Sequence, residues 1–238
     1  VPEYIHVAPI CKIEGNSKRK LSKRKDPEVG LSYYNELGYP KGAVIEYLTS
    51  IANSSFEEWR LANPDAPFES YPFRFENMSV SGAVFDLAKL DDVCKNYFAK
   101  LTAEEVYAGY LAWAKIYDAD MAARLEADPA YFTAMFAIDR GNEKPRKDLY
   151  RWSMVREYYA YFIDEDFEKM TAGGYDLGGL EPKKADMAAA LTEYLKIYDP
   201  TKDRDEWFAG IKETAAAIGY APETKLYKKN PELYKGQL

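Results

Sequence analysis

Residues 18–25 read Lys-Arg-Lys-Leu-Ser-Lys-Arg-Lys, a dense basic segment in a chain whose formal net charge is -7. Asp26-Pro27 follow, and the residue before a proline is pushed out of the α region, so the segment is expected to form a short loop. Lys20 and Lys23 on such a loop can close on one polyphosphate, because each ammonium is a point charge on a flexible stem. Basic runs are also typical of solvated patches and localisation signals, so the order of the residues is needed to distinguish these from a phosphate site.

That order favours a phosphate site. Lys20-Leu21-Ser22-Lys23-Arg24 resembles the Lys-Met-Ser-Lys-Ser signature loop of class I aminoacyl-tRNA synthetases, in the Lys-Leu-Ser-Lys-Arg form typical of glutamyl-tRNA synthetases. Residues 4–10 are similar to the strand that leads into this loop in the family. Residues 80–90, with Phe85-Asp86 and Lys89-Leu90, and residues 228–236 are similar to later segments in the same order. The resemblance therefore runs along essentially the whole chain.

The resemblance implies an enzyme that activates glutamate with ATP, releases pyrophosphate and transfers the glutamyl group to tRNA(Glu). Positioned cations lower the barrier as charge builds on the leaving pyrophosphate. The family motif gives this catalytic role to Lys20 and Lys23, and ATP binding to Lys20, Leu21, Ser22, Lys23 and Arg24. Magnesium is expected to arrive with ATP, with no metal ion held by the protein, and the enzyme is expected to be a monomer.

One family motif is missing. The His-Ile-Gly-His signature needs two histidines, whereas His6 is the single histidine of this sequence. We therefore expect the C-terminal portion of a longer synthetase, without most of the nucleotide-binding domain and inactive alone. A first residue other than methionine agrees with this expectation.

Composition sets broad limits. The chain is 47% hydrophobic and 15% aromatic, enough for a packed core. It has no apolar run of transmembrane length and no secretory signal, so no membrane partner is expected. Cys11 and Cys94 are too few for a disulfide framework or a zinc site, which favours a reducing cytoplasm.

The expected fold class is mostly α. A short α/β stem-contact region carries the Lys-Leu-Ser-Lys-Arg loop, and an α-helical anticodon-binding bundle, incomplete at its C-terminus, follows it. The expected domains are residues 1–25, the end of the catalytic domain; residues 26–100, the stem-contact domain; and residues 101–238, the helical anticodon-binding domain. Short strands are predicted at residues 4–10 and 71–75, and extended chain at residues 225–235.

Helix start and stop signals are frequent. Residues 27–52 are predicted helical with a break at Gly38 and Pro40. Helix starts are predicted at Thr102 with Glu105, at Asp128-Pro129, and at Asp203 with Glu206. Gly219 is predicted to end a helix. Asp86 and Lys89 are predicted to form a surface pair on a helix. The helical stripes predicted to face the core are Val44, Tyr47, Leu48 and Ile51; Val106, Tyr110, Trp113 and Tyr117; Met187, Leu191, Leu195 and Tyr198; and Trp207, Ile211, Ala215 and Ile218.

A second basic region lies at residues 139–151, predicted to be a Gly/Pro-containing loop and the helix after it. Arginine suits bidentate contacts with phosphates and base edges. In the family that the chain resembles, arginines on the anticodon-binding helices contact the anticodon bases. Arg140 and Arg146 are the candidate tRNA-binding residues, although a solvated basic surface explains them equally well. Residues 173–179 are rich in glycine but lack the Gly-Lys-Ser/Thr ending of a P-loop, so they are predicted to be a connection.

Two alternatives from other classes remain. A non-catalytic tRNA- or RNA-binding helical module predicts affinity that falls steeply with salt. A helical adaptor with an unrelated basic segment predicts no preference for tRNA. Glutaminyl-tRNA synthetase shares the loop, but its anticodon region is built from β-barrels, and the helical periodicity after Thr102 argues against it.

Overall fold

The computed structural model describes residues 4, 6–78, 81–174 and 183–236, and it divides the chain into two compact units, Val1–Met170 and Thr171–Leu238. The mostly α fold class is confirmed, because helices make up most of the regular structure of the described residues and the sheet among them is small, with two antiparallel strands. In the first unit the elements are β1 (Cys11–Glu14), β2 (Ser17–Lys20), α1 (Leu31–Leu37), α2 (Lys41–Ala52), α3 (Phe56–Ala62), α4 (Leu87–Lys100), α5 (Ala103–Tyr117), α6 (Ala119–Ala127), α7 (Pro129–Ala137), α8 (Val155–Tyr158) and α9 (Asp164–Thr171). The second contains α10 (Lys184–Leu195), α11 (Arg204–Ala217) and α12 (Thr224–Lys229).

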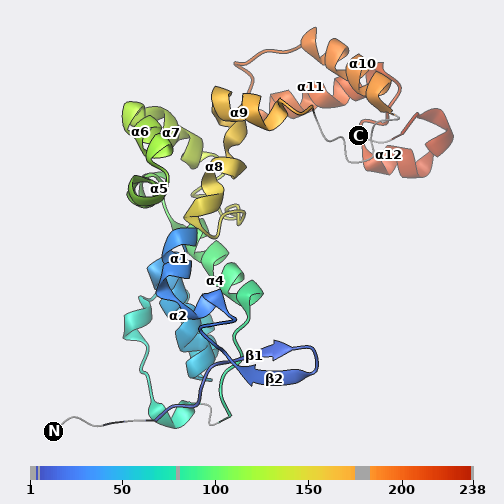
Figure 1. Cartoon of the computed structure of the whole chain (residues 1–238). Helices are drawn as coiled ribbons and strands as arrows, with labels where there is room; N and C mark the ends of the chain where they lie inside the picture. The colour runs from blue at the N-terminus through green and yellow to red at the C-terminus, as the bar shows by residue number, and fades with distance from the viewer. Residues whose placement is uncertain (1–3, 5, 79–80, 175–182, 237–238) are drawn as a thin grey trace. The chain divides into compact units, whose positions relative to one another are not determined.

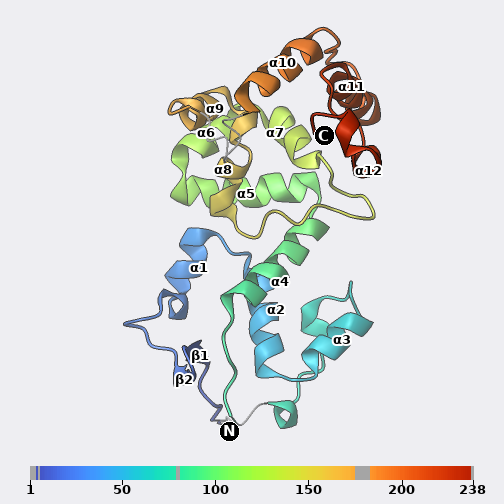
Figure 2. The same ribbon diagram turned by 90° about the vertical axis from the view of Figure 1, so that its right-hand side faces the viewer.

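The first unit has two hydrophobic clusters. One lies between α2 and α4, which run side by side in Figure 2, and buries Tyr47, Phe85 and Leu90. The other lies among α5, α6, α7 and α8 and buries Tyr110, Leu125 and Phe136. The predicted stripe on α2 faces the first cluster, as expected.

The predicted helix signals are confirmed. Thr102 and Glu105 form a reciprocal capping box at α5, and Asp203 and Glu206 form another at α11. The Asp128 side chain accepts the Tyr131 N–H at the start of α7, where Pro129 is the first helical residue. Gly38 ends α1 in the left-handed region, and Gly219 follows α11 with a φ of 87°.

The strand predictions were wrong. Residues 6–10 and 71–75 are not in strands, whereas residues 11–20 form the hairpin of β1 and β2 seen in Figure 1. Residues 225–235 were expected to be extended, but α12 and a 3-10 turn (Pro231–Leu233) occupy most of them. Asp86 and Lys89 do not pair through their side chains: Asp86 caps α4, and Lys89 pairs with Glu57.

Three of the predicted stripes are only partly buried, and one of them is on α11, where Trp207 is 46% exposed. Tyr117 on α5 is 42% exposed, and in the second unit Leu191, Leu195 and Tyr198 are 56–72% exposed. Periodicity identifies the apolar face of a helix but not whether another element covers that face. Most of the glycine-rich stretch 173–179 lies outside the described residues. None of the helices in the described part of the chain is both long and apolar enough to cross a bilayer.

Candidate functional site

The basic segment begins inside the β1–β2 hairpin, not in a loop as predicted. β1 and β2 pair antiparallel with Cys11 opposite Lys20 and Glu14 opposite Ser17. Gly15 starts the two-residue turn with a φ of 59°, the positive φ that tight hairpin turns require at this position. The signature sequence therefore begins at Lys20, the last residue of β2, and continues into the loop from Leu21.

The hairpin is anchored to the segment that precedes α4. The Cys11 N–H donates to the Ala83 carbonyl and the Phe85 N–H to the Cys11 carbonyl, both at 2.8 Å. The Lys18 ammonium donates to the carbonyl oxygens of Ser81 and Gly82 at 3.0 and 2.8 Å. A Cβ on Gly82 would lie 2.5 Å from a backbone oxygen of Pro9, so only glycine fits this close approach.

Two further basic side chains of the hairpin are held by acidic partners. Lys12 Nζ lies 2.5 Å from Glu28 Oε1. The Arg19 guanidinium donates two hydrogen bonds to the carboxylate of Asp26, at 2.7 and 2.8 Å. Asp26 and Glu28 are both buried, and the Arg19 guanidinium together with the Ser22 N–H holds the pKa of Asp26 well below its usual value. Lys12 of β1 and two residues of the basic segment, Lys18 and Arg19, thus stabilise the hairpin.

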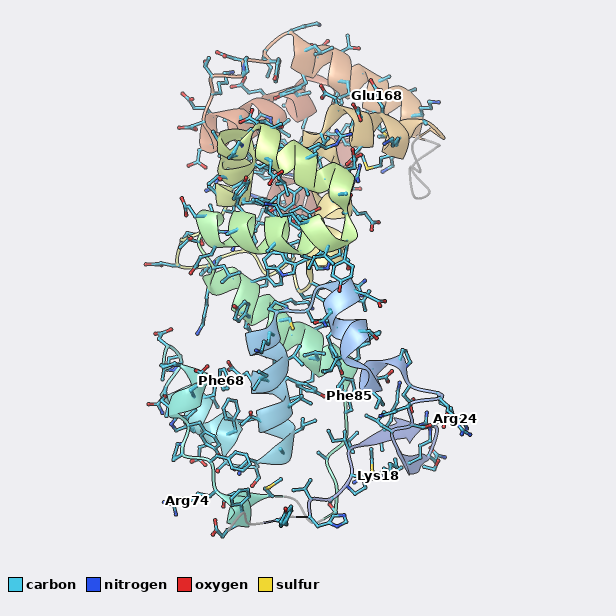
Figure 3. The ribbon with its side chains drawn as sticks, turned by 60° about the vertical axis from the view of Figure 1, so that its left-hand side comes forward. Lys18, Arg24, Phe68, Arg74, Phe85 and Glu168 are labelled. Atoms are coloured by element: carbon cyan, nitrogen blue, oxygen red, sulfur yellow. The ribbon has the colours of Figure 1, made fainter. Side chains whose placement is uncertain are left out.

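The other four basic side chains face solvent. Lys20, Lys23, Arg24 and Lys25 are exposed, and none of their four side chains makes a hydrogen bond or ion pair with any residue that the structure describes. Arg24 lies at the outer edge of the loop in Figure 3. Four positive charges within six residues create a local positive potential on an acidic protein, and such a potential attracts anions.

The two uncharged residues of the loop have different environments. Leu21 is half-buried and packs against the cluster of α2 and α4. Ser22 is half-buried; its N–H donates to Asp26 at 2.8 Å, and its Oγ accepts the Arg24 N–H at 3.4 Å. The loop thus has an apolar inner side and a cationic outer side, which suits contact with a phosphate chain.

The candidate tRNA-binding arginines differ from each other. The Arg140 guanidinium donates to the carbonyl oxygens of Phe136, Phe98 and Leu101 at 2.6–3.0 Å, so it joins the end of α7 to the end of α4. Arg146 is 56% exposed and paired with Asp148 at 2.6 Å. A helix was expected after Gly141 and Pro145, but residues 145–149 have no regular structure.

An open groove of about 1040 Å³ lies beside this loop. Its walls include Tyr97 and Lys100 of α4 and Lys144 and Lys147 of the loop. Sequence reasoning missed the groove, since it is formed by residues far apart in the chain. Among the described residues, no group of three or more His, Cys, Asp or Glu side chains is arranged to hold a metal ion.

Comparison with known proteins gives a consistent result. The chain matches no family model. It is 48% identical over its whole length to a glutamate–tRNA ligase of Clostridium perfringens strain 13, and 46% identical to one of Acetivibrio thermocellus. It is also 38% identical, over 99% of its length, to one of Sorangium cellulosum.

In each case the match covers 43% of the relative, so the chain spans less than half the length of the curated proteins it matches. Over its own length, however, it is a clear homologue of one part of the glutamate–tRNA ligases.

Proposed function

We propose that the chain is the part of a glutamate–tRNA ligase that supplies the ATP-phosphate loop together with helices that contact tRNA(Glu). The observation that carries the proposal is the division of the basic segment. Two of its cations, Lys18 and Arg19, stabilise the hairpin together with Lys12 of β1. The side chains of the other four, Lys20, Lys23, Arg24 and Lys25, are exposed and have no partner among the described residues. Surface cations near a rigid hairpin are suited to meeting the phosphates of ATP.

Lys20 and Lys23 are the proposed catalytic cations. When the carboxylate of glutamate attacks the α-phosphate of ATP, the bond to pyrophosphate breaks and negative charge moves onto the leaving group. Ammonium groups that are already in place stabilise this charge more in the transition state than in the ground state. Magnesium bound to ATP would supply additional positive charge.

Arg24 and Ser22 have supporting roles. The Arg24 guanidinium can bind phosphate oxygens bidentately. The Ser22 hydroxyl can donate its proton to a phosphate oxygen, but the Ser22 N–H is already used by Asp26. The hydroxyl, and not that backbone amide, is therefore the proposed contribution of Ser22 to ATP binding.

Binding of MgATP and of inorganic pyrophosphate to the purified chain, measured by calorimetry, tests the loop. We expect Lys23→Ala and Lys20→Ala each to weaken pyrophosphate binding about tenfold, as expected for the loss of one charge-assisted hydrogen bond. Lys41→Ala removes an exposed lysine at the start of α2 and should leave the affinity unchanged. Equal affinities for the chain and all three variants would contradict the proposal.

The proposed domains are those predicted from the sequence: residues 1–25, 26–100 and 101–238 as the end of the catalytic domain, the stem-contact domain and the anticodon-binding domain. The chain is proposed to be a cytoplasmic monomer and to be inactive without the other side of the ATP site. Glutamate-dependent exchange between ATP and pyrophosphate by this chain alone would overturn the proposed inactivity.

Arg146 is the better supported tRNA contact, because its side chain is exposed whereas Arg140 is bonded to three carbonyl oxygens of the protein. Lys144 and Lys147 lie on the same loop and line the adjacent groove. Binding to tRNA(Glu) and to a non-cognate tRNA over a salt series tests this contact. A cognate preference that survives moderate salt and falls in Arg146→Ala is the expected result. Equal and salt-labile binding of both tRNAs would favour a non-catalytic RNA-binding module.

A further inference from the structure

Asp26 is a buried carboxylate directly after the basic segment, and its contacts converge on the loop. The side chain is 2% exposed and accepts two hydrogen bonds from Arg19 and one from the Ser22 N–H. A buried carboxylate without such partners would be strongly destabilising. Asp26 therefore ties the strand before the loop to the first turn of the loop.

The backbone closes the same turn. The Ser22 carbonyl accepts the N–H groups of Lys25 and Asp26, at 3.0 and 2.9 Å. The Ser22 N–H donates to the Asp26 side chain, so residues 22–26 are closed by three hydrogen bonds. Lys23 and Arg24 lie between these closing residues, and their direction is set by the turn.

We propose that Asp26 is a positioning residue that holds the turn of residues 22–26 and thereby pre-orders Lys23 and Arg24 for a polyphosphate ligand. The inference rests on the proposed function, since it assumes that the loop binds a polyphosphate. Asp26 does not contact the ligand. It acts by removing the conformational freedom that the turn would otherwise lose when the ligand binds.

A purely electrostatic role for Asp26 predicts the opposite sign. A negative charge near the site repels an anion, so its removal alone would strengthen pyrophosphate binding. Positioning predicts weaker binding when the closing hydrogen bond is lost. The direction of the change therefore separates the two roles.

The experiment measures pyrophosphate affinity and the hydrogen-exchange rate of the Ser22 amide in the chain and two variants. Asp26→Ala removes the charge and the acceptor, and we expect an affinity at least tenfold lower and faster exchange at Ser22. Asp26→Asn keeps an amide oxygen that can accept the Ser22 N–H, so intermediate values are expected. The Asp26→Asn variant also allows the positioning role to be tested if the Asp26→Ala variant does not fold.

Asp91→Asn is the matched control. Asp91 accepts the Tyr39 hydroxyl at 2.8 Å and has no contact with the loop, so its replacement should change neither measurement. Affinities of both Asp26 variants equal to or higher than that of the chain, with unchanged exchange at Ser22, would overturn the positioning role. Absence of pyrophosphate binding by the unsubstituted chain would instead overturn the proposed function and with it this inference.

Discussion

At the scale of single residues, Gly109 shows how packing can outweigh helix propensity. In the middle of α5, alanine is more favourable than glycine by about 1 kcal/mol. A Cβ on Gly109 would, however, lie 2.5 Å from Cζ2 of Trp152. The Trp152 side chain is packed against Phe98, with 4.5 Å between the two ring centroids. We expect Gly109→Ala to lower the free energy of unfolding by about 1–2 kcal/mol, because overpacking exceeds the gain in propensity. Urea denaturation followed by circular dichroism measures this change.

Gly42 provides the comparison. It lies in the first turn of α2, where an added Cβ would meet Tyr97 at an ordinary 3.4 Å. Gly42→Ala should therefore leave the stability unchanged or raise it slightly. If the two substitutions had the same effect, the contact with Trp152 could not be the cause.

Sequence reasoning succeeded at this scale where the partners are close in the chain. The hydrogen bonds between Thr102 and Glu105 join residues three positions apart, and the residue types alone predict them. It could not predict the hydrogen bonds that Arg140 makes to carbonyl oxygens on α4 and after it, because these acceptors are 39–42 positions away. The separation of structural from exposed cations in residues 12–25 was likewise not predictable, because it depends on the pairing of β1 with β2.

At the scale of elements, one arginine connects three helix termini. Arg156 of α8 donates to Asp118 at the start of α6 and to both carboxylate oxygens of Asp166 in α9. Asp166 is 7% exposed, so removal of Arg156 leaves a buried carboxylate whose remaining ion-pair partner among the described residues is Lys169, 3.8 Å away. We expect Arg156→Met to lower the free energy of unfolding by about 3 kcal/mol at pH 7. Chemical denaturation checks this value.

Arg124→Met is the control for the loss of an arginine with acidic partners. Arg124 pairs with Asp120 and Glu165, which are 58% and 64% exposed, so its loss should cost at most about 1 kcal/mol. An equal effect of the two substitutions would show that burial of Asp166 is not what makes Arg156 important.

The ion pair between Arg156 and Asp166 predicts that the stability of the chain depends on pH. The Arg156 guanidinium lowers the pKa of Asp166, so the stabilisation is complete above the unfolded pKa of about 3.9 and is lost as the pH falls through the folded value. The difference in unfolding free energy between the chain and Arg156→Met should therefore narrow below about pH 4. Denaturation curves at pH 7 and at pH 3 measure it. A difference that stays constant would exclude the ionised pair as its source.

The errors at this scale concern strands. Helix signals are local, whereas a strand needs a partner that local alternation does not specify. Residues 71–75 alternate apolar and polar side chains but have no strand beside them in the described structure. Gly15-Asn16 between residues 11–14 and 17–20 was the hairpin signal that could have located β1 and β2.

At the scale of the whole molecule, buried apolar side chains are unevenly distributed. Both hydrophobic clusters lie in Val1–Met170. In Thr171–Leu238 the buried residues among those described are small: Gly210, Thr214, Ala215 and Ala221. Burial of apolar surface is the dominant favourable term in folding, so the second unit has the weaker core of the two.

We therefore expect Thr171–Leu238 to unfold at a lower urea concentration than Val1–Met170. The tryptophans report on the units separately, since Trp207 lies in the second and Trp59, Trp113 and Trp152 in the first. In fluorine NMR of the 5-fluorotryptophan-labelled chain, the Trp207 resonance should reach its unfolded position first, and Trp207→Phe assigns it. Coincident transitions at all four tryptophans would mean that the chain unfolds as one cooperative unit and that the small core of Thr171–Leu238 does not set its stability.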